Sequence, residues 1–318
     1  MFTTNIGTDL VKAKQFLEEG EVVAIPTETV YGLAANALNP NAVAKIFEAK
    51  NRPHFDPLIV HLKNVDEFEK YAQNIPDSAY ILAERFLPGP LTLLLPKQSV
   101  IPDLVTSGLE TVGLRIPYHQ LTLELLNSLD FPLAAPSANP FGYISPTTAK
   151  HVADQLNNKI PYILDGGSCG VGVESTIVEP TANGIIVHRL GGISLEELKS
   201  NFKDVSLNLN HASNPKSSGQ LLSHYAPKKR LIFTSSVQQE IETHTESNIA
   251  VISFFETSYS NATVFPLSKV KDLNEAASNL FKVMRHLDEG VFDLIIAEKF
   301  PEHGLGRAIN DRLQRAAY

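Results

Sequence analysis

The chain has 318 residues, a net charge of −8 and a single cysteine, Cys169. Its 43% hydrophobic and 19% charged residues are typical of a globular protein of two domains rather than a disordered chain. The lone cysteine excludes an internal disulfide framework and fits a reducing cytoplasm. No signal peptide is visible, and no apolar run approaches the roughly 20 residues that a membrane-spanning helix needs.

The charge is unevenly distributed along the chain. Residues 1–205 carry 15 Lys and Arg against 23 Asp and Glu, whereas residues 206–318 carry 12 of each. Neither part has the positive excess of a nucleic-acid-binding surface. If the protein binds a polyanion, we expect it to do so in a local basic pocket.

The first two thirds of the sequence mix strand and helix patterns. Short apolar runs predict buried strands, and Asn39 followed by Pro40 is a clear helix start, because Asn caps a helix and Pro fits its first position. This mixture predicts an α/β domain with one large twisted sheet. We expect strands at 22–26, 57–62, 91–95, 111–116, 131–138, 175–180 and 185–190, and helices at 9–19, 39–50, 78–86, 121–129, 147–156 and 194–200.

A different composition follows. Residues 205–227 are rich in Ser, Asn, Gly and Pro and hold one formal charge, Lys216. Segments of this length are either flexible tethers or functional loops such as lids. Strand and helix patterns then alternate to the end of the chain, which predicts a small, mostly parallel, Rossmann-like sheet. We therefore divide the chain into a catalytic domain at 1–205, a linker or lid at 206–228 and a C-terminal domain at 229–318.

Several common motifs are missing. The sequence has no P-loop, no GxGxxG after a strand, no HExxH, no CxxC and no GxSxG. The glycine-rich stretch Gly166–Gly172 does not have dinucleotide-binding spacing, and the histidines show no metal-ligand spacing. These gaps disfavour conventional ATPases, dehydrogenases, zinc hydrolases and serine hydrolases, and we expect no metal site made by protein side chains.

Three polar segments remain as candidates for a site. PTETVYGLAA follows a buried strand, where ligand contacts are common, although its polar residues can equally cap a turn. Lys50 and Arg52 end a helix just before Pro53; they either complement the helix dipole or place at a sheet edge the positive charge that a triphosphate needs. APSANPFGYISPT offers hydroxyl and amide groups for phosphate or ribose, or is simply a rigid loop.

Together these segments resemble the YrdC-like domain family, and the whole chain resembles its two-domain threonylcarbamoyl-AMP synthases. PTETVYGL, KNRP, PLIVH, LRIP, APSAN, GVESTIV and HRLGG occur in the family's order across residues 8–200. HYAP at 224–227 and GLGRAINDRLQRAA at 304–317 extend the resemblance to the two-domain subgroup. The chain departs from the family where GQLLS precedes HYAP in place of GMKYR, and at Asp56, where such proteins often carry Asn.

The resemblance implies a nucleotidyltransferase that joins L-threonine, bicarbonate or CO2, and ATP into threonylcarbamoyl-AMP and releases pyrophosphate. A downstream transferase complex would pass the threonylcarbamoyl group to tRNA, so tRNA contact by this chain is not required. Magnesium is expected on the triphosphate. Lys50 and Arg52 are implied as catalytic cations that neutralise phosphate charge.

The same resemblance implies two binding sites. Arg115 would grip the threonine carboxylate with its guanidinium fork, while a carboxylate of the protein is the alternative partner for an arginine on a buried strand. The implied ATP side consists of Arg52, Asp56, Thr111, Ser137, Asn139, Ser145, Arg189 and Tyr225, and the threonine side of Thr29, His61, Arg115, Ala135 and Ser175.

Two alternatives stay open at this point. One is an RNA-binding YrdC-like module without ATP chemistry, which the net charge of −8 disfavours. The other is a carbamoyl-adenylate former like the related domain of hydrogenase-maturation proteins, which carry acylphosphatase-like and zinc-finger-like segments that this sequence lacks.

Overall fold

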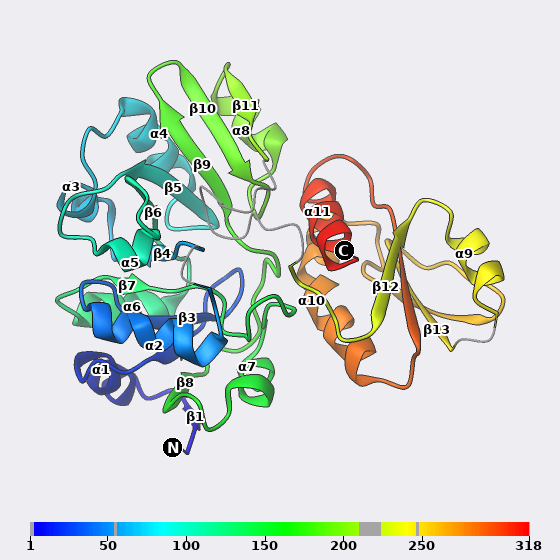
Figure 1. Ribbon diagram of the computed structural model, residues 1–318. Helices are drawn as coiled ribbons and strands as arrows, with labels where there is room; N and C mark the ends of the chain where they lie inside the picture. The colour runs from blue at the N-terminus through cyan, green and yellow to red at the C-terminus, as the bar shows by residue number, and fades with distance from the viewer. Residues whose placement is uncertain (1–2, 54–55, 210–223, 246–247, 318) are drawn as a thin grey trace.

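The computed structural model describes residues 3–53, 56–209, 224–245 and 248–317, which form two α/β units side by side (Figure 1). The larger unit contains the first eleven strands of the described chain. These strands are β1 (Asn5–Gly7), β2 (Val23–Ile25), β3 (Gly32–Asn36), β4 (Ile59–His61), β5 (Leu91–Pro96), β6 (Thr111–Arg115), β7 (Leu133–Ala134), β8 (Tyr162–Leu164), β9 (Thr176–Thr181), β10 (Gly184–Arg189) and β11 (Val205–Leu207).

These strands form one mixed sheet in the order β1-β8-β2-β3-β7-β4-β6-β5-β9-β10-β11. The order brings β4 parallel to β6, with His61 opposite Arg115, and places β9 next to β5. The helices are α1 (Leu10–Glu18), α2 (Pro40–Lys50), α3 (Phe68–Tyr71), α4 (Asp77–Phe86), α5 (Asp103–Thr106), α6 (Gln120–Ser128), α7 (Ala149–Leu156) and α8 (Leu195–Asn201), with a 3-10 turn at Val65–Glu67.

The smaller unit is a parallel sheet with helices on both faces. Its elements are β12 (Arg230–Thr234), α9 (Val237–Thr243), β13 (Ile249–Ser253), β14 (Ala262–Pro266), α10 (Leu273–Glu289), β15 (Leu294–Glu298) and α11 (Gly306–Ala316). The strand order is β12-β15-β13-β14, and all pairs are parallel. The predicted fold class, a large-sheet α/β domain followed by a smaller Rossmann-like one, is confirmed.

Helix α2 forms as predicted and ends beside the site. Asn39 caps it by accepting hydrogen bonds from the amides of Asn41 and Ala42. At the other end Asn51 adopts a left-handed conformation with φ 51°, which stops the helix. The chain therefore turns after Lys50, and Arg52 lines the pocket described below.

Other local predictions need correction. The strand predicted at 131–138 forms only at Leu133–Ala134, because Pro132 and Pro136 on either side lack the amide hydrogens that a ladder requires. Strand β3 was not predicted, since its sequence GLAAN has weak strand propensity. Strands β1, β8 and β11 have three residues each, too few to show an alternating pattern.

The segment predicted as a linker is only partly described. Strand β11 continues to Leu207, so the first residues after 205 still belong to the large sheet. The rest of the predicted linker or lid, residues 210–223, lies outside the described residues. The chain is described again from His224, whose amide donates to the Arg315 carbonyl, and the amide of Ala226 donates to the Gly142 carbonyl.

Helices α10 and α11 cover the face of the small sheet that points towards the large unit, and α9 lies on the opposite face (Figure 1). The approach is close at Gly172, where φ is 78° and a Cβ atom would lie 2.4 Å from the Ser278 Cα of α10. Arg285 of α10 donates to the backbone carbonyls of Ile144 and Ser145 in the large unit. No helix in the described part of the chain is long and apolar enough to cross a membrane.

Candidate active site

A partly open pocket lies where β3, β4, β6 and β9 meet the chain near residue 225. Its free volume is about 40 Å³, and His224 and Tyr225 line one side of it. Three arginines of the large unit line it, Arg52, Arg115 and Arg189, together with the carboxylate of Glu174. The lining residues are Thr27, Val30, Gly32, Arg52, Ile59, His61, Arg115, Ala135, Pro136, Ser137, Glu174, Ser175, Arg189, His224 and Tyr225.

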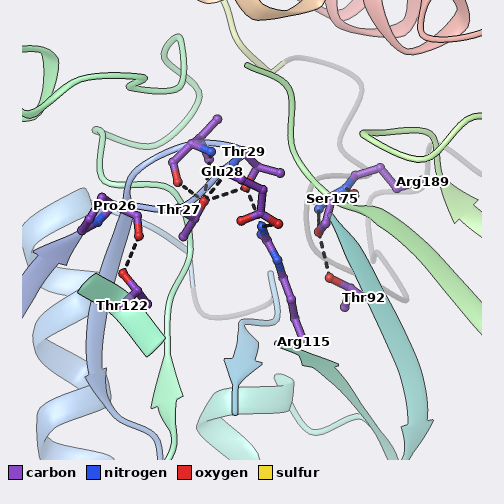
Figure 2. Close-up of polar contacts among 10 residues, drawn as sticks. Pro26, Thr27, Glu28, Thr29, Thr92, Arg115, Thr122, Ser175 and Arg189 are labelled. Carbon is purple, nitrogen blue, oxygen red and sulfur yellow. Dashed lines mark hydrogen bonds and ion pairs between the residues drawn. The ribbon is translucent and has the colours of Figure 1, made fainter. Parts of the chain in front are cut away.

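The PTET loop is fixed by its own hydrogen bonds (Figure 2). The Thr27 hydroxyl donates to the Val30 carbonyl at 2.7 Å and lies 2.8 Å from the Thr29 hydroxyl. Thr122 of α6 donates to the Pro26 carbonyl at 2.5 Å and ties the start of the loop to the helix. The loop therefore holds Glu28 and Thr29 at the carboxyl end of β6.

Arg115 meets both of these side chains. Its Nη2 donates to the Thr29 hydroxyl at 2.8 Å and lies 2.8 Å from Glu28 Oε1 (Figure 2). The protein carboxylate that was the alternative partner for Arg115 is thus present in this structure. The Nε of Arg115 is buried and has no hydrogen-bond partner among the described residues, so the guanidinium keeps an unused donor.

His61 lies opposite Arg115 on the neighbouring strand and is 3% exposed. Burial, followed by the charge of Arg115, lowers its pKa to about 3. The imidazole is therefore neutral at physiological pH and can only offer a neutral hydrogen bond to a ligand.

Arg52 and Asp56 form a buried ion pair at 2.8 Å. Arg52 also donates from Nε to the Asp56 carbonyl and from Nη2 to the Pro57 carbonyl. Asp56 has no exposed surface and is the counter-ion of Arg52, so its charge is compensated within the protein. Because Arg52 neutralises it, the carboxylate at position 56 need not repel an anionic ligand bound nearby.

Lys50 is buried and holds the APSAN loop. Its Nζ donates to the carbonyls of Ser137 and Asn139, both at 2.5 Å. Burial, then the charge of Arg52, lowers its pKa well below the ordinary value. Lys50 does not line the pocket, whereas Ser137 at the other end of its hydrogen bond does.

Ser175 and Arg189 form the wall contributed by β9 and β10. Arg189 donates from Nε to the Ser175 carbonyl and from Nη2 to the Ser175 hydroxyl, both at 3.0 Å. The Ser175 hydroxyl also lies 2.8 Å from that of Thr92 (Figure 2). Burial lowers the pKa of Arg189 to about 10, and the guanidinium still carries its charge at neutral pH.

Glu174, next to Ser175 in the pocket wall, is contacted from the small unit. Glu174 accepts a hydrogen bond from the Ser145 hydroxyl at 2.6 Å and pairs with Arg312 of α11 at 2.8 Å. Burial would raise the pKa of Glu174, but Arg312 and Arg189 outweigh it, so the pKa lies below the ordinary value. Arg312 also sits over the ring of Tyr225, 5.2 Å from its centre.

The structure brings most, but not all, predicted site residues to the pocket. Those that line it are Arg52, His61, Arg115, Ala135, Ser137, Ser175, Arg189 and Tyr225. Thr29, Asp56 and Ser145 contact lining residues through the bonds described above. Lys50 and Asn139 do not line the pocket, and Lys50 reaches it through its hydrogen bond to Ser137. Thr111 begins β6 four residues before Arg115, about 13 Å away at 3.3 Å per residue.

Several residues at the site had no predicted role, among them Glu28, Glu174, His224 and Arg312. Each lies inside a sequence motif of the resemblance, PTETVYGL, GVESTIV, HYAP and GLGRAINDRLQRAA, so the motifs located them without giving them a role. Among the described residues, no group of three or more His, Cys, Asp or Glu side chains is arranged to hold a metal ion.

Fold and pocket together define an α/β protein with an arginine-rich pocket at the edge of its large sheet. A family model described as "Telomere recombination" matches residues 15–191, and one described as "Threonylcarbamoyl-AMP synthase, C-terminal domain" matches residues 193–318. The chain belongs to the two-domain threonylcarbamoyl-AMP synthase family.

Similar proteins extend over the whole chain. The threonylcarbamoyl-AMP synthase of Pyrococcus abyssi is 41% identical over 96% of this chain and 93% of its own length. That of Bacillus subtilis is 40% identical over 97% of this chain and 92% of its own. A crystal structure of P. abyssi Sua5 complexed with L-threonine matches 100% of this chain and 97% of that one, with a TM-score of 0.92 and 39% identity.

Proposed function

We propose that this protein makes threonylcarbamoyl-AMP from L-threonine, bicarbonate or CO2, and ATP, and releases pyrophosphate. The observation that carries the proposal is a full-length similarity to threonylcarbamoyl-AMP synthases combined with an arginine-rich pocket at the family's sequence motifs. The product would supply a transferase complex that modifies tRNA, in the cytoplasm.

The threonine side of the pocket would hold the amino acid by its carboxylate. Arg115 has the planar fork for this contact, and Thr29 already bonds to that fork. In this structure Glu28 lies at Nη2 of Arg115, so the substrate carboxylate would either displace it or use the unpartnered Nε. The threonine nitrogen then forms a bond to the carbon of CO2 and loses a proton, which gives a carbamate.

The ATP side would support attack of a carbamate oxygen on the α-phosphorus, while the bond from that phosphorus to the pyrophosphate oxygen breaks. Such a step needs positioning and charge neutralisation more than covalent help from the protein. We propose that Arg52 and Arg189 supply positive charge here, with Ser137, Asn139, Ser145 and Tyr225 around the nucleotide. Lys50 would contribute its charge and also hold the loop that carries Ser137.

Magnesium would enter as part of the substrate, bound to the ATP phosphates. The two carboxylates next to the phosphate-binding arginines are both engaged, Asp56 with Arg52 and Glu174 with Arg312. A pocket of about 40 Å³ is too small for ATP, so we propose that the His224–Tyr225 side moves outward on binding.

We propose the domain division 1–205, 206–228 and 229–318. Two separate sheets support it, and the first residues of the proposed linker, up to Leu207, still pair in the large sheet. The two units share a close interface through α10 and α11, so the division is one of folding units and not of independent bodies.

The experiment that tests the function is an omission series. Purified protein is incubated with ATP, magnesium, L-threonine and bicarbonate, and pyrophosphate is measured while each component is left out in turn. Release should require both threonine and bicarbonate. Serine should react more weakly, since one lost methyl group changes discrimination by only about 1–3 kcal/mol. Equal release without any amino acid would overturn the proposal.

A further inference from the structure

We propose that Arg312, on helix α11 of the C-terminal unit, is a positioning residue for the ATP side of the pocket. It would act by neutralising Glu174 and by supporting Tyr225. The inference rests on the proposed function, because it names the ATP side by that function. It also gives the C-terminal unit a defined part in the reaction.

The contacts of Arg312 are specific and fully enclosed. The side chain has no exposed surface. Its Nε donates to Glu174 Oε2 at 2.8 Å, its Nη2 donates to the Leu190 carbonyl at 2.8 Å, and its Nη1 pairs with Asp311 Oδ2 at 2.5 Å. Three donors of one planar group are thus committed to fixed acceptors, and lysine cannot reproduce this geometry.

Glu174 makes the pairing relevant to the site. It lines the pocket beside Ser175, and Ser145 donates to its other carboxylate oxygen at 2.6 Å. Without Arg312, this buried carboxylate would face the phosphates of ATP with much less compensation, and like charges repel strongly in a low-dielectric site. Arg312 therefore neutralises the negative charge of Glu174 in the pocket wall, and it keeps Glu174 where it accepts the hydrogen bond from Ser145.

Arg312 reaches a second wall through Tyr225. Its guanidinium carbon lies 5.2 Å from the centre of the Tyr225 ring, which is buried and lines the pocket. The Leu190 carbonyl that it binds follows Arg189 directly, so the same side chain also anchors the end of β10. Among the described residues, Arg312 makes these contacts with Glu174, Leu190 and Tyr225 and makes none with Arg115, Thr29 or His61. Ser175, which the resemblance assigns to threonine, is reached only through its chain neighbour Glu174.

The test is a double-mutant cycle on the full-length enzyme with variants R312Q, E174Q and R312Q/E174Q. The matched control is R307Q, because Arg307 is on the same helix and also pairs across the interface, with Glu196, but at a partly exposed position. KM for ATP, KM for threonine and kcat are measured for each, together with ATP binding by calorimetry and the midpoint of thermal unfolding.

R312Q should raise the KM and the Kd for ATP about tenfold, which corresponds to a coupling energy typical of residues in one hydrogen-bond network. The KM for threonine should change less than about twofold. Removing Arg312 from the E174Q variant should raise the KM for ATP less than about threefold, since E174Q has already removed the buried negative charge. R307Q should match the wild type.

Two results would overturn the inference: equal loss for ATP and threonine in R312Q, or an undiminished loss for ATP when Arg312 is removed from E174Q. If R312Q does not fold, E174Q is compared with R312Q/E174Q, in which Glu174 carries no charge, and a rise of about tenfold in the KM for ATP between these two variants overturns the inference. Failure of the proposed function would look different, since the wild type itself would then release no threonine-dependent pyrophosphate.

Discussion

Arg115 Nη2 lies 2.8 Å from Glu28 Oε1, so the guanidinium proposed to bind threonine already holds a carboxylate of the protein. Both side chains are nearly buried, and the pair is locked by the PTET loop. A substrate carboxylate and Glu28 would thus compete for the same cation. This competition gives Arg115 a role that can be separated from simple structural support.

Replacing Arg115 with Lys should raise the KM for threonine about 10- to 100-fold, because a charged hydrogen bond from the fork, of about 1.5–3 kcal/mol, is lost. The KM for ATP should change less than about twofold. Steady-state kinetics with each substrate varied separately measures both values. Glu28→Gln is the companion variant, and it should lower the KM for threonine because a weaker competitor remains. A parallel rise for ATP and threonine in Arg115→Lys would remove Arg115 from the threonine site.

Arg52 should prove more important for turnover than its partner. Arg52→Gln should reduce kcat by about 100-fold, as when a donor to developing charge is lost. It also strands Asp56, and removing one member of a buried pair costs about 3–5 kcal/mol of stability. The double variant R52Q/D56N avoids that stranded charge. The double variant should fold well and still show a low kcat. A near-normal kcat would mean that Arg52 has only a structural role, as the partner of Asp56.

Lys50 offers a contrasting case. Lys50→Met removes the donor to the Ser137 and Asn139 carbonyls, and each unsatisfied buried acceptor costs about 1–3 kcal/mol. We therefore expect a lower free energy of unfolding together with a loss of turnover of about 100-fold. Urea unfolding and the pyrophosphate assay measure the two effects. A stable, fully active variant would contradict both proposed roles of Lys50.

Gly172→Ala should loosen the contact between the two units. Its left-handed backbone costs about 1–2 kcal/mol for an alanine, and the new Cβ would collide with Ser278, adding about 1–3 kcal/mol. Gly142→Ala is a matched control with the same φ of 78° and open space around the Cβ. Urea unfolding of both variants isolates the collision. An equal decrease in the free energy of unfolding for Gly172→Ala and Gly142→Ala would show that the interface is not tightly packed at Gly172.

His61 should make the fold sensitive to acid. Its pKa is about 3 in the folded protein, so between about pH 6.5 and pH 3 the unfolded chain binds a proton that the folded chain does not. The free energy of unfolding should therefore fall as the pH drops, by up to about 1.4 kcal/mol per unit from this group.

The check compares urea unfolding at pH 7 and pH 4. His61→Gln should lose roughly 1–3 kcal/mol less than the wild type over this interval. His303→Gln, at an exposed position, serves as the control and should behave as the wild type does. An unchanged pH dependence in His61→Gln would contradict the assigned protonation state.

The sequence predicted those features that local patterns encode. Asn39 and Pro40 located the start of α2, and strand and helix alternation identified the parallel sheet of the C-terminal unit. Arg52, Arg115 and Arg189 were located by motifs, and the structure brings them to one pocket.

Other features arise only from tertiary contacts. The pairing of Glu28 with Arg115 joins residues 87 positions apart, and that of Glu174 with Arg312 joins residues 138 positions apart, so no local pattern reports either. The strand predicted at 131–138 was shortened by two prolines, whose missing amide hydrogens outweigh an apolar sequence. Thr111, implied on the ATP side by the resemblance, begins β6 about 13 Å from Arg115 of the threonine side, and its assignment stays a prediction.

The most direct test of the central claim is detection of the product itself. The purified protein is incubated with ATP, magnesium, L-threonine and carbon-13 bicarbonate, and the nucleotides are analysed at once by mass spectrometry. Threonylcarbamoyl-AMP should appear with a single carbon-13 atom, in step with pyrophosphate, and should vanish when threonine is omitted. Formation of AMP and pyrophosphate without any labelled threonylcarbamoyl-AMP, or with unlabelled threonyl-AMP in its place, would contradict the account.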